Sequence, residues 1–129
     1  MPVPYIFVTQ QAPPGSSREG EPITLARTKV RNRLDTDDLC KMISARCTLN
    51  GADVKAVFAI LSELFSQELP DGAALQLDGI GTFSLTANTG ALAEPEKVRQ
   101  GDFHNLRIRF SPDRRLKKIY NTVTFQKMR

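Results

Sequence analysis

Residues 75–83 decide the fold, and they read Leu75-Gln76-Leu77-Asp78-Gly79-Ile80-Gly81-Thr82-Phe83. Leu75 and Leu77 alternate with polar residues, which is the period of a strand. The same period returns at Phe83 and Leu85 after a run with two glycines, Asp78–Gly81, and such a run permits a tight turn. We therefore expect an antiparallel hairpin here.

Two helices are expected before this hairpin. Asp35 and Asp38 resemble a capping box, with carboxylates near the amides of a first helical turn. The apolar residues that follow keep helical spacing, at Leu39, Cys40, Ile43 and Cys47. Asn50 is a good N-cap for the second helix, which has Asp53 in its first turn.

The second helix carries a broad apolar stripe and ends at Pro70-Asp71-Gly72. Its main positions keep the helical pattern over four turns, at Val54, Val57, Phe58, Leu61, Leu64, Phe65 and Leu69. Ala56 and Ile60 widen the stripe beyond what one small sheet would cover. A stripe this broad predicts a partner chain.

The two cysteines are expected to be free and buried. Cys40 and Cys47 lie on the apolar face of the first helix, where a separation of about 10 Å exceeds the roughly 7 Å between Cα atoms that a disulfide can span. We interpret both as small buried apolar residues. A zinc site would need two more ligands, and the chain has a single histidine, His104. We expect no metal.

A third strand and a short helix are expected after the hairpin. Residues 86–104 are rich in helix and strand breakers, and Leu106, Ile108 and Phe110 then alternate with Arg107 and Arg109. This alternation predicts a strand with one apolar and one cationic face. Ser111-Pro112-Asp113 has an N-cap, a proline and an acid in the order that opens a helix, with Leu116 and Ile119 inward.

Short strands are also expected near both ends of the chain. Tyr5–Thr9 and Ile23–Val30 flank a Pro- and Gly-rich loop and predict a hairpin, and Thr122–Phe125 predicts a last strand. The order of elements indicates an α+β fold with a mainly antiparallel sheet. We divide the chain into a β extension, residues 1–34, and a main domain, residues 35–129.

Charge is unevenly distributed along the 129 residues, although the net charge is only +4. Residues 1–34 carry five bases and two acids, residues 35–72 three and seven, residues 73–104 two and four, and residues 105–129 eight and one. The acidic middle and the basic C-terminal segment, at +7, favour anion binding near the C-terminus.

The start of the chain has no signal-peptide pattern, and no apolar run approaches the roughly 20 residues of a membrane helix. We expect a cytoplasmic protein.

Motifs of enzyme chemistry are absent from the sequence. It has no nucleophile elbow, phosphate loop, zinc signature or dinucleotide fingerprint. His104 has no nucleophile beside it. We therefore expect no enzyme, no cofactor and no small-molecule substrate.

Two runs resemble signatures of the bacterial histone-like HU/IHF family. Residues 75–83 resemble its V-x-L-x-G-[FIL]-G-T-F signature, and residues 110–117, Phe-Ser-Pro-Asp-Arg-Arg-Leu-Lys, resemble its F-x-P-[GS]-K-x-L-K run. The similarity covers about residues 35–120, and the added N-terminal strands look like those of longer HU-related proteins of the Bacteroidetes. The resemblance implies an intertwined homodimer, with a helical base and two β-arms that embrace bent DNA in its minor groove, in the nucleoid.

The resemblance also indicates residues for DNA binding. Arg114 and Lys117 match family positions that approach phosphates beside the arms. Nearby cations join them as candidates, namely Arg107, Arg109, Arg115 and Lys118. In the arm, approximately residues 86–106, the candidates are Pro95, Lys97 and Arg99.

The arm departs from the family pattern, which is basic and carries a proline wedge. Here Glu94 and Glu96 bracket Pro95, and residues 86–106 hold Lys97 and Arg99 against those two acids and Asp102. Carboxylates are repelled by the dense phosphates of a minor groove. We interpret Pro95 as a turn proline in preference to a wedge, and we expect the arms to bend DNA less than those of ordinary members.

These features are consistent with two functions. The leading hypothesis is an HU-like homodimer that binds double-stranded DNA through phosphates, with little sequence preference because such contacts do not read bases. The alternative is an HU-fold scaffold with weak or no DNA binding, whose arm and N-terminal strands bind protein partners. The acidic arm and the added strand edges motivate it.

Overall fold

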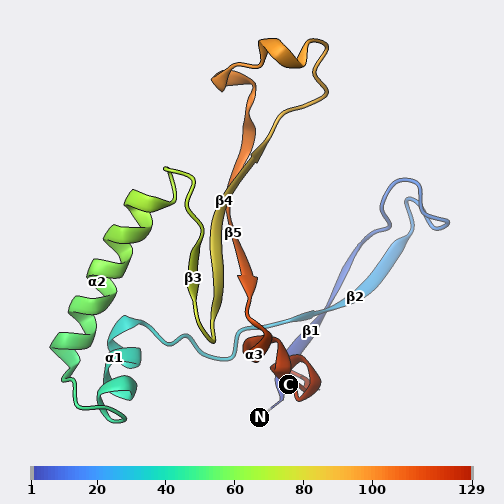
Figure 1. The fold of residues 1–129 in the computed structure, drawn as a ribbon. Helices are drawn as coiled ribbons and strands as arrows, with labels where there is room; N and C mark the ends of the chain where they lie inside the picture. The colour runs from blue at the N-terminus through green and yellow to red at the C-terminus, as the bar shows by residue number, and fades with distance from the viewer. Residues whose placement is uncertain (1, 129) are drawn as a thin grey trace. The chain divides into compact units, whose positions relative to one another are not determined.

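The structure, a computed structural model, describes residues 2–128, which form two compact units. The terminal unit holds the residues up to Asp35 together with those from Tyr120 onward, and the central unit is Thr36–Ile119. Each unit contains one three-stranded sheet, and the helices α1, α2 and α3 lie in the central unit (Figure 1). The fold class is α+β with antiparallel pairs, as predicted, and one parallel pair in addition.

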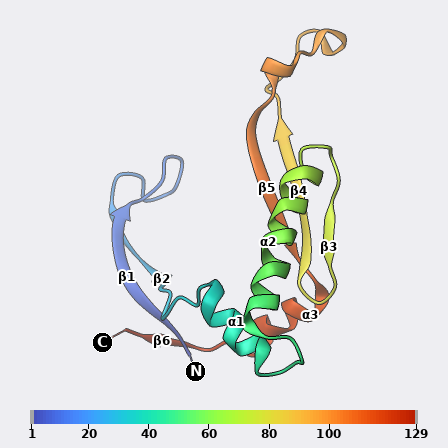
Figure 2. The same cartoon turned by 90° about the vertical axis from the view of Figure 1, so that its left-hand side faces the viewer.

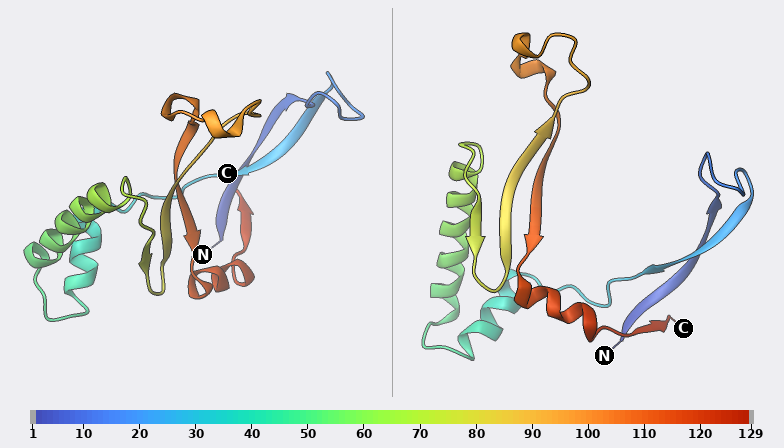
Figure 3. Two further views of the ribbon diagram at one scale, coloured as in Figure 1. Left: turned by 45° about the horizontal axis from the view of Figure 1, so that its top comes forward. Right: turned by 45° about the vertical axis from the view of Figure 1, so that its right-hand side comes forward.

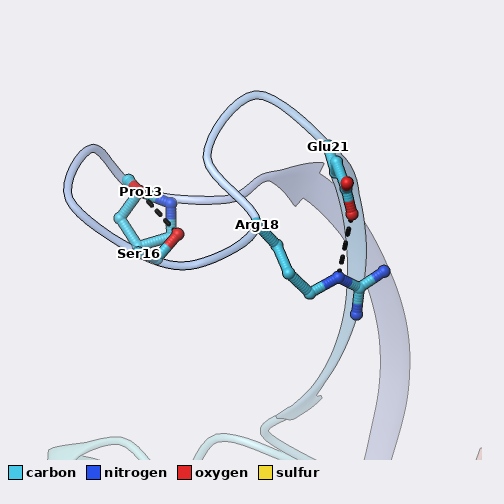
Figure 4. Close-up of polar contacts among 4 residues, drawn as sticks. All are labelled: Pro13, Ser16, Arg18 and Glu21. Carbon is cyan, nitrogen blue, oxygen red and sulfur yellow. Dashed lines mark hydrogen bonds and ion pairs between the residues drawn. The ribbon is translucent and has the colours of Figure 1, made fainter.

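The sheet of the terminal unit has the order β2-β1-β6. Strands β1 (Val3–Gln11) and β2 (Pro22–Thr28) form the predicted antiparallel hairpin. Its connection is closed by two local contacts (Figure 4): the Ser16 hydroxyl donates to the Pro13 carbonyl at 2.8 Å, and the Arg18 guanidinium donates to the Glu21 carboxylate at 3.0 Å.

The predicted last strand, Thr122–Phe125, is wrong in its extent. Strand β6 is Phe125–Lys127, and it runs parallel to β1 with Val3 opposite Phe125 (Figure 3). The register is fixed by two backbone hydrogen bonds, from Val3 N–H to the Thr124 carbonyl at 2.7 Å and from Met128 N–H to the Tyr5 carbonyl at 2.9 Å. Pairing with β1 therefore places the strand after Thr124.

The two helices are α1 (Thr36–Ser44) and α2 (Gly51–Glu68). The predicted N-cap of α2 is confirmed as a capping box, in which Asp53 N–H donates to Asn50 Oδ1 at 2.8 Å and Asn50 N–H donates to Asp53 Oδ2 at 3.4 Å. Side-chain caps of this kind satisfy amides that have no partner within the helix.

The two cysteines are free, but only Cys40 is buried. The expectation that Cys47 is buried is wrong, because α1 ends at Ser44 and Arg46 N–H donates to the Ile43 carbonyl in a turn at 2.9 Å. Cys47 therefore lies beyond the helix and is exposed.

The sheet of the central unit has the order β3-β4-β5, all antiparallel. Its strands are β3 (Leu75–Leu77), β4 (Gly81–Asn88) and β5 (His104–Pro112). The predicted glycine hairpin is confirmed, with Leu75 opposite Phe83, and α2 lies along this sheet (Figure 2). The Phe83 ring lies 5.0 Å from the Phe65 ring of α2 and 4.8 Å from the Phe110 ring, between centroids.

The start of the last helix differs from the prediction. Strand β5 continues through Ser111 to Pro112, and Asp113 is the N-cap of α3 (Arg114–Lys117), so Ser111 is not a cap. Because proline has no N–H to donate, it is confined within sheets to positions such as edge strands. Pro112 is the last residue of the edge strand β5, and it lies opposite Gly81.

The side chain predicted to point inward at Ile119 is 49% exposed, whereas Leu116 is half-buried. Ile119 belongs to the 3₁₀ turn η3 (Lys118–Asn121). A 3₁₀ turn rotates successive side chains by more than an α-helix does, so Ile119 leaves the face that Leu116 occupies.

Little of the chain is buried. The buried apolar residues within the described part of the chain are Ala12, Cys40, Val54 and Leu69. The accessible surface is 10961 Å², whereas a compact monomer of this mass would expose about 6,800 Å² and two separate compact units about 8,200 Å². Neither unit therefore buries the apolar surface expected of a self-sufficient domain.

Gly81 offers the first test of this fold. A Cβ at Gly81 would collide with the Ser111 carbonyl and lie 2.6 Å from the Phe110 ring, whereas a Cβ at Gly51 meets nothing within 4 Å. We expect Gly81→Ala to lower the free energy of unfolding by about 3 kcal/mol or more, and Gly51→Ala to change it by less than about 1 kcal/mol. Denaturation followed by circular dichroism measures both, and equal effects would contradict the packing described.

Candidate nucleic-acid interface

The central sheet has two chemically different faces. Its register places Phe83, Leu85, Ile108 and Phe110 on the face that packs on α2. Alternate side chains point to the opposite face. That face carries polar and cationic residues, namely Gln76, Thr82, Ser84, Thr86, Arg107, Arg109 and Ser111. No carboxylate belongs to this set, so the described strands present an acid-free polar face; the carboxylate of Asp78, in the turn after β3, accepts a hydrogen bond from Gln76 at 3.5 Å.

Two arginines lie side by side on this polar face. Arg109 is opposite Ser84 and Arg107 is opposite Thr86, and both arginines are exposed. Successive residues on one face of a strand are about 6.6 Å apart. The arrangement combines guanidinium donors with hydroxyl groups, which together can hydrogen-bond to the oxygens of phosphates.

Four further cations lie on α3 and η3, and Asp113 holds this segment to the glycine turn. Its carboxylate accepts a hydrogen bond from Gly79 N–H at 2.9 Å, and Asp113 N–H donates to the Ile80 carbonyl at 2.9 Å. Sequence reasoning assigned Asp113 to a helix start and missed this contact. The available signal was that Asp113 is the one acid among the eight bases of residues 105–129.

The segment that Asp113 holds presents four cations in five residues, Arg114, Arg115, Lys117 and Lys118. The Arg115 side chain lies over the turn, since its Cδ and Nη1 would be 3.9 Å from a Cβ placed on Gly79. Within residues 2–128, the ion pairs are formed by Arg18, Lys55 and Lys97. The cations of β5, α3 and η3 thus keep their charge unneutralised in the part of the chain that the structure describes.

The arm tip is chemically distinct from this basic end. Pro95 opens the 3₁₀ turn η1 (Pro95–Lys97), and Lys97 pairs with Glu94 at 2.8 Å. In the second turn, η2 (Gln100–Asp102), Arg99 N–H donates to the Asp102 carboxylate at 2.8 Å. The tip and α3 lie at opposite ends of β5 (Figure 1). The structure therefore brings Arg107 and Arg109 into one strand next to α3, and leaves the three arm candidates apart from them.

An apolar groove lies between α2 and the central sheet. It has a volume of about 540 Å³ and is lined mainly by Phe58, Leu61, Phe65, Leu69, Phe83, Leu85 and Ile108. A second apolar stripe on α2 is left exposed, with Val57 at 53%, Ile60 at 57% and Leu64 at 44%. This agrees with the broad stripe noted in the sequence.

Other kinds of site find no support among residues 2–128. No group of three metal-ligating side chains is assembled there. No helix in the described chain has the length and apolar character needed to cross a membrane.

Comparison with known proteins gives a family match over nearly the whole chain. A family model described as "HU domain fused to wHTH, Ig, or Glycine-rich motif" matches residues 1–127, and no curated protein matches. A solved structure of a candidate bacterial DNA-binding protein from Bacteroides vulgatus is similar, with a TM-score of 0.62 and 8% identity. The similarity covers 98% of this chain and 49% of that one. At this identity the similarity shows a shared fold.

Asp113 allows the anchoring of α3 to be tested. We expect Asp113→Ala to lower the free energy of unfolding by roughly 2 kcal/mol, because the Gly79 amide loses a charged acceptor. Asp113→Asn keeps an acceptor oxygen and should lose less than half as much. Urea denaturation at a fixed protein concentration compares the two variants, and equal losses would exclude the hydrogen bond as the anchor.

Proposed function

The chain belongs to the family of HU domains fused to a winged helix-turn-helix, Ig or glycine-rich motif, and from this premise we propose that it is a homodimeric architectural protein of the nucleoid. It binds double-stranded DNA with little sequence preference. The observation that carries the proposal is the acid-free polar face of the central sheet, with Arg107 and Arg109 on it. Because the apolar face packs on α2, this polar face is the one free to meet an anion.

Phosphate contacts explain how such a face would bind DNA. Arginine donates two parallel hydrogen bonds to a phosphate, and neighbouring hydroxyl groups add further donors. Ser84 and Thr86 lie opposite the two arginines. Each neutralised phosphate releases counterions, so affinity depends steeply on salt. Contacts to the backbone position a protein on DNA without reading its bases.

The cations of α3 and η3 extend this surface in the proposal. Arg114, Arg115, Lys117 and Lys118 follow directly after β5 and carry no ion pair within residues 2–128. Their fixed position depends on Asp113, which contacts the glycine turn. A held cation loses less freedom on binding than one on a mobile segment.

The arm contributes less than the sheet in this proposal. Lys97 is paired with Glu94, and Arg99 lies next to the carboxylate of Asp102. Pro95 lies within a 3₁₀ turn between two acids. The arm tip therefore contacts the minor groove weakly, and DNA is bent less than a fully inserted wedge would bend it.

Dimerisation follows from the apolar surface that one chain leaves uncovered. The groove of about 540 Å³ beside α2 and the exposed stripe of Val57, Ile60 and Leu64 lie in the same unit. Obligate homodimers bury about 2,000–5,000 Å² or more. The accessible surface of the chain is 10961 Å², whereas two separate compact units would expose about 8,200 Å². The excess is an area of the size that such an interface buries. A second copy would cover both the groove and the stripe.

The scaffold alternative rests on a different observation. The arm tip carries Leu92, Val98 and Phe103 as exposed apolar residues beside its acids, and β2 is an edge strand that can accept a further strand. A folded dimer that fails to bind DNA would favour this alternative.

DNA binding is tested by titrating labelled duplex DNA at several salt concentrations. We expect wild type to bind with a steep salt slope, and Arg107→Gln with Arg109→Gln to reduce that slope by about 1.8 for every duplex sequence. Arg18→Gln with Arg46→Gln removes the same charge at two positions that do not belong to the face and should leave the slope unchanged. No binding at micromolar wild-type protein, or binding indifferent to salt, would contradict the proposal.

The dimer is tested on the exposed stripe of α2. We expect Ile60→Glu to be monomeric in light scattering, because it would bury a charge in the interface. Ala59→Glu adds the same charge at a neighbouring exposed position outside the stripe and should stay dimeric. A wild-type protein that is monomeric at tens of micromolar would refute the dimer.

A further inference from the structure

A row of alternating cations in the terminal unit is not used by the surface described so far. Arg27, Lys29, Arg31 and Arg33 occur at every second position, and residues 22–34 contain no acid. All four are exposed. We propose that these four residues, the cationic stripe, form a second and separate contact for the phosphates of duplex DNA.

The stripe begins in a strand and continues into the segment that precedes α1. Arg27 lies near the end of β2, opposite Ile6, and β2 is an edge strand of its sheet. Lys29 N–H donates to the Pro4 carbonyl at 2.8 Å, which continues the pairing beyond β2. Residues 29–35 contain no helix or turn. Where this segment continues the extended course of β2, alternate residues point to the same side, and in the proposal the four cations form one row.

A hollow in the same unit lies beside part of the stripe. It has a volume of about 410 Å³ and is lined by residues 2–4 and 28–31. Lys29 and Arg31 both line it. The two side chains therefore border one concave surface.

Contacts within the protein leave the charge of the stripe unneutralised. The Arg27 guanidinium donates to the side-chain oxygen of Gln10 at 3.2 Å, and that of Arg31 donates to the Pro2 carbonyl. Both acceptors are neutral. Arginine has five N–H donors, so each of these side chains keeps others for a ligand.

Acids flank the stripe in the sequence, with Glu19 and Glu21 before it and Asp35 two residues after Arg33. The Glu21 carboxylate pairs with Arg18 (Figure 4), and that of Glu19 accepts a hydrogen bond from Gly15 N–H at 3.3 Å. Within residues 2–128 no ion pair involves the stripe. Its four charges are thus available to an external anion.

The spacing suits a chain of phosphates better than a single anion. Cations on one side of an extended chain are about 6.6 Å apart, so the row spans roughly 20 Å. Duplex DNA carries a charge every 3.4 Å along each strand. A polyanion of this kind can contact all four cations, whereas a free phosphate can contact only one or two.

The inference rests on the proposed function, because the stripe is joined by a short link to the central unit that is proposed to bind the duplex. Only Leu34 and Asp35 separate Arg33 from α1. A short link between two binding segments gives the second an effective concentration of about millimolar. A row of exposed charges can therefore contribute to binding although it would be weak alone.

The test compares two double variants of the full chain with wild type. Lys29→Gln with Arg33→Gln removes the two cations whose side chains have no hydrogen-bond partner within the described chain. Arg18→Gln with Arg46→Gln is the control of equal charge. We expect the stripe variant to reduce the salt slope on duplex DNA by about 1.8, so that wild type loses about twelvefold more affinity than the variant between 50 and 200 mM salt. The control should match wild type.

Each other outcome is decisive. If wild type binds DNA and the stripe variant has the wild-type slope, the inference is overturned and the proposed function stands. If wild type does not bind DNA, the proposed function fails, and this inference fails with it. A second arm uses vesicles containing phosphatidylserine: loss of vesicle binding in the stripe variant with unchanged DNA binding would overturn the DNA assignment in favour of a membrane.

Discussion

The packing of the Phe83 ring against the rings of Phe65 and Phe110 is the interaction on which the central unit depends. It joins α2 to β4 and β5 at centroid distances of 5.0 and 4.8 Å, and Gly81 lets β5 approach closely enough to form it. This face of the sheet packs on α2, and successive side chains along a strand point to opposite faces. The residues next to the aromatic ones therefore point to the other face. Arg107 and Arg109 must point the other way. The cationic face is therefore a consequence of how the aromatic residues pack.

The same packing leaves the unit incomplete. The aromatic stack occupies part of the surface between α2 and the sheet, and a groove and an exposed stripe lie beside it. In a dimer such as the one proposed, folding and association would be a single equilibrium, and apparent stability would rise with protein concentration.

Much of this architecture can be predicted from local sequence. The glycine turn before Phe83 and the N-cap at Asn50 depend on residues close in the chain, and both have the expected geometry. The expectations that failed depend on distant partners. β6 begins where β1 can pair with it, and β5 continues to Pro112 because Gly81 lies opposite. Asp113 also contacts a turn far away in sequence. The spacing of apolar residues along the sequence does not indicate such contacts between distant residues.

The parallel pairing of β6 with β1 has a consequence for the order of folding. The central unit lies in the chain between the strands of the terminal sheet. During synthesis, the hairpin of β1 and β2 emerges first but cannot gain its third strand until the whole central unit has been made. Closing a loop of that length also costs entropy, and this cost falls if the intervening chain has already become compact. The terminal sheet is thus completed only after the central unit.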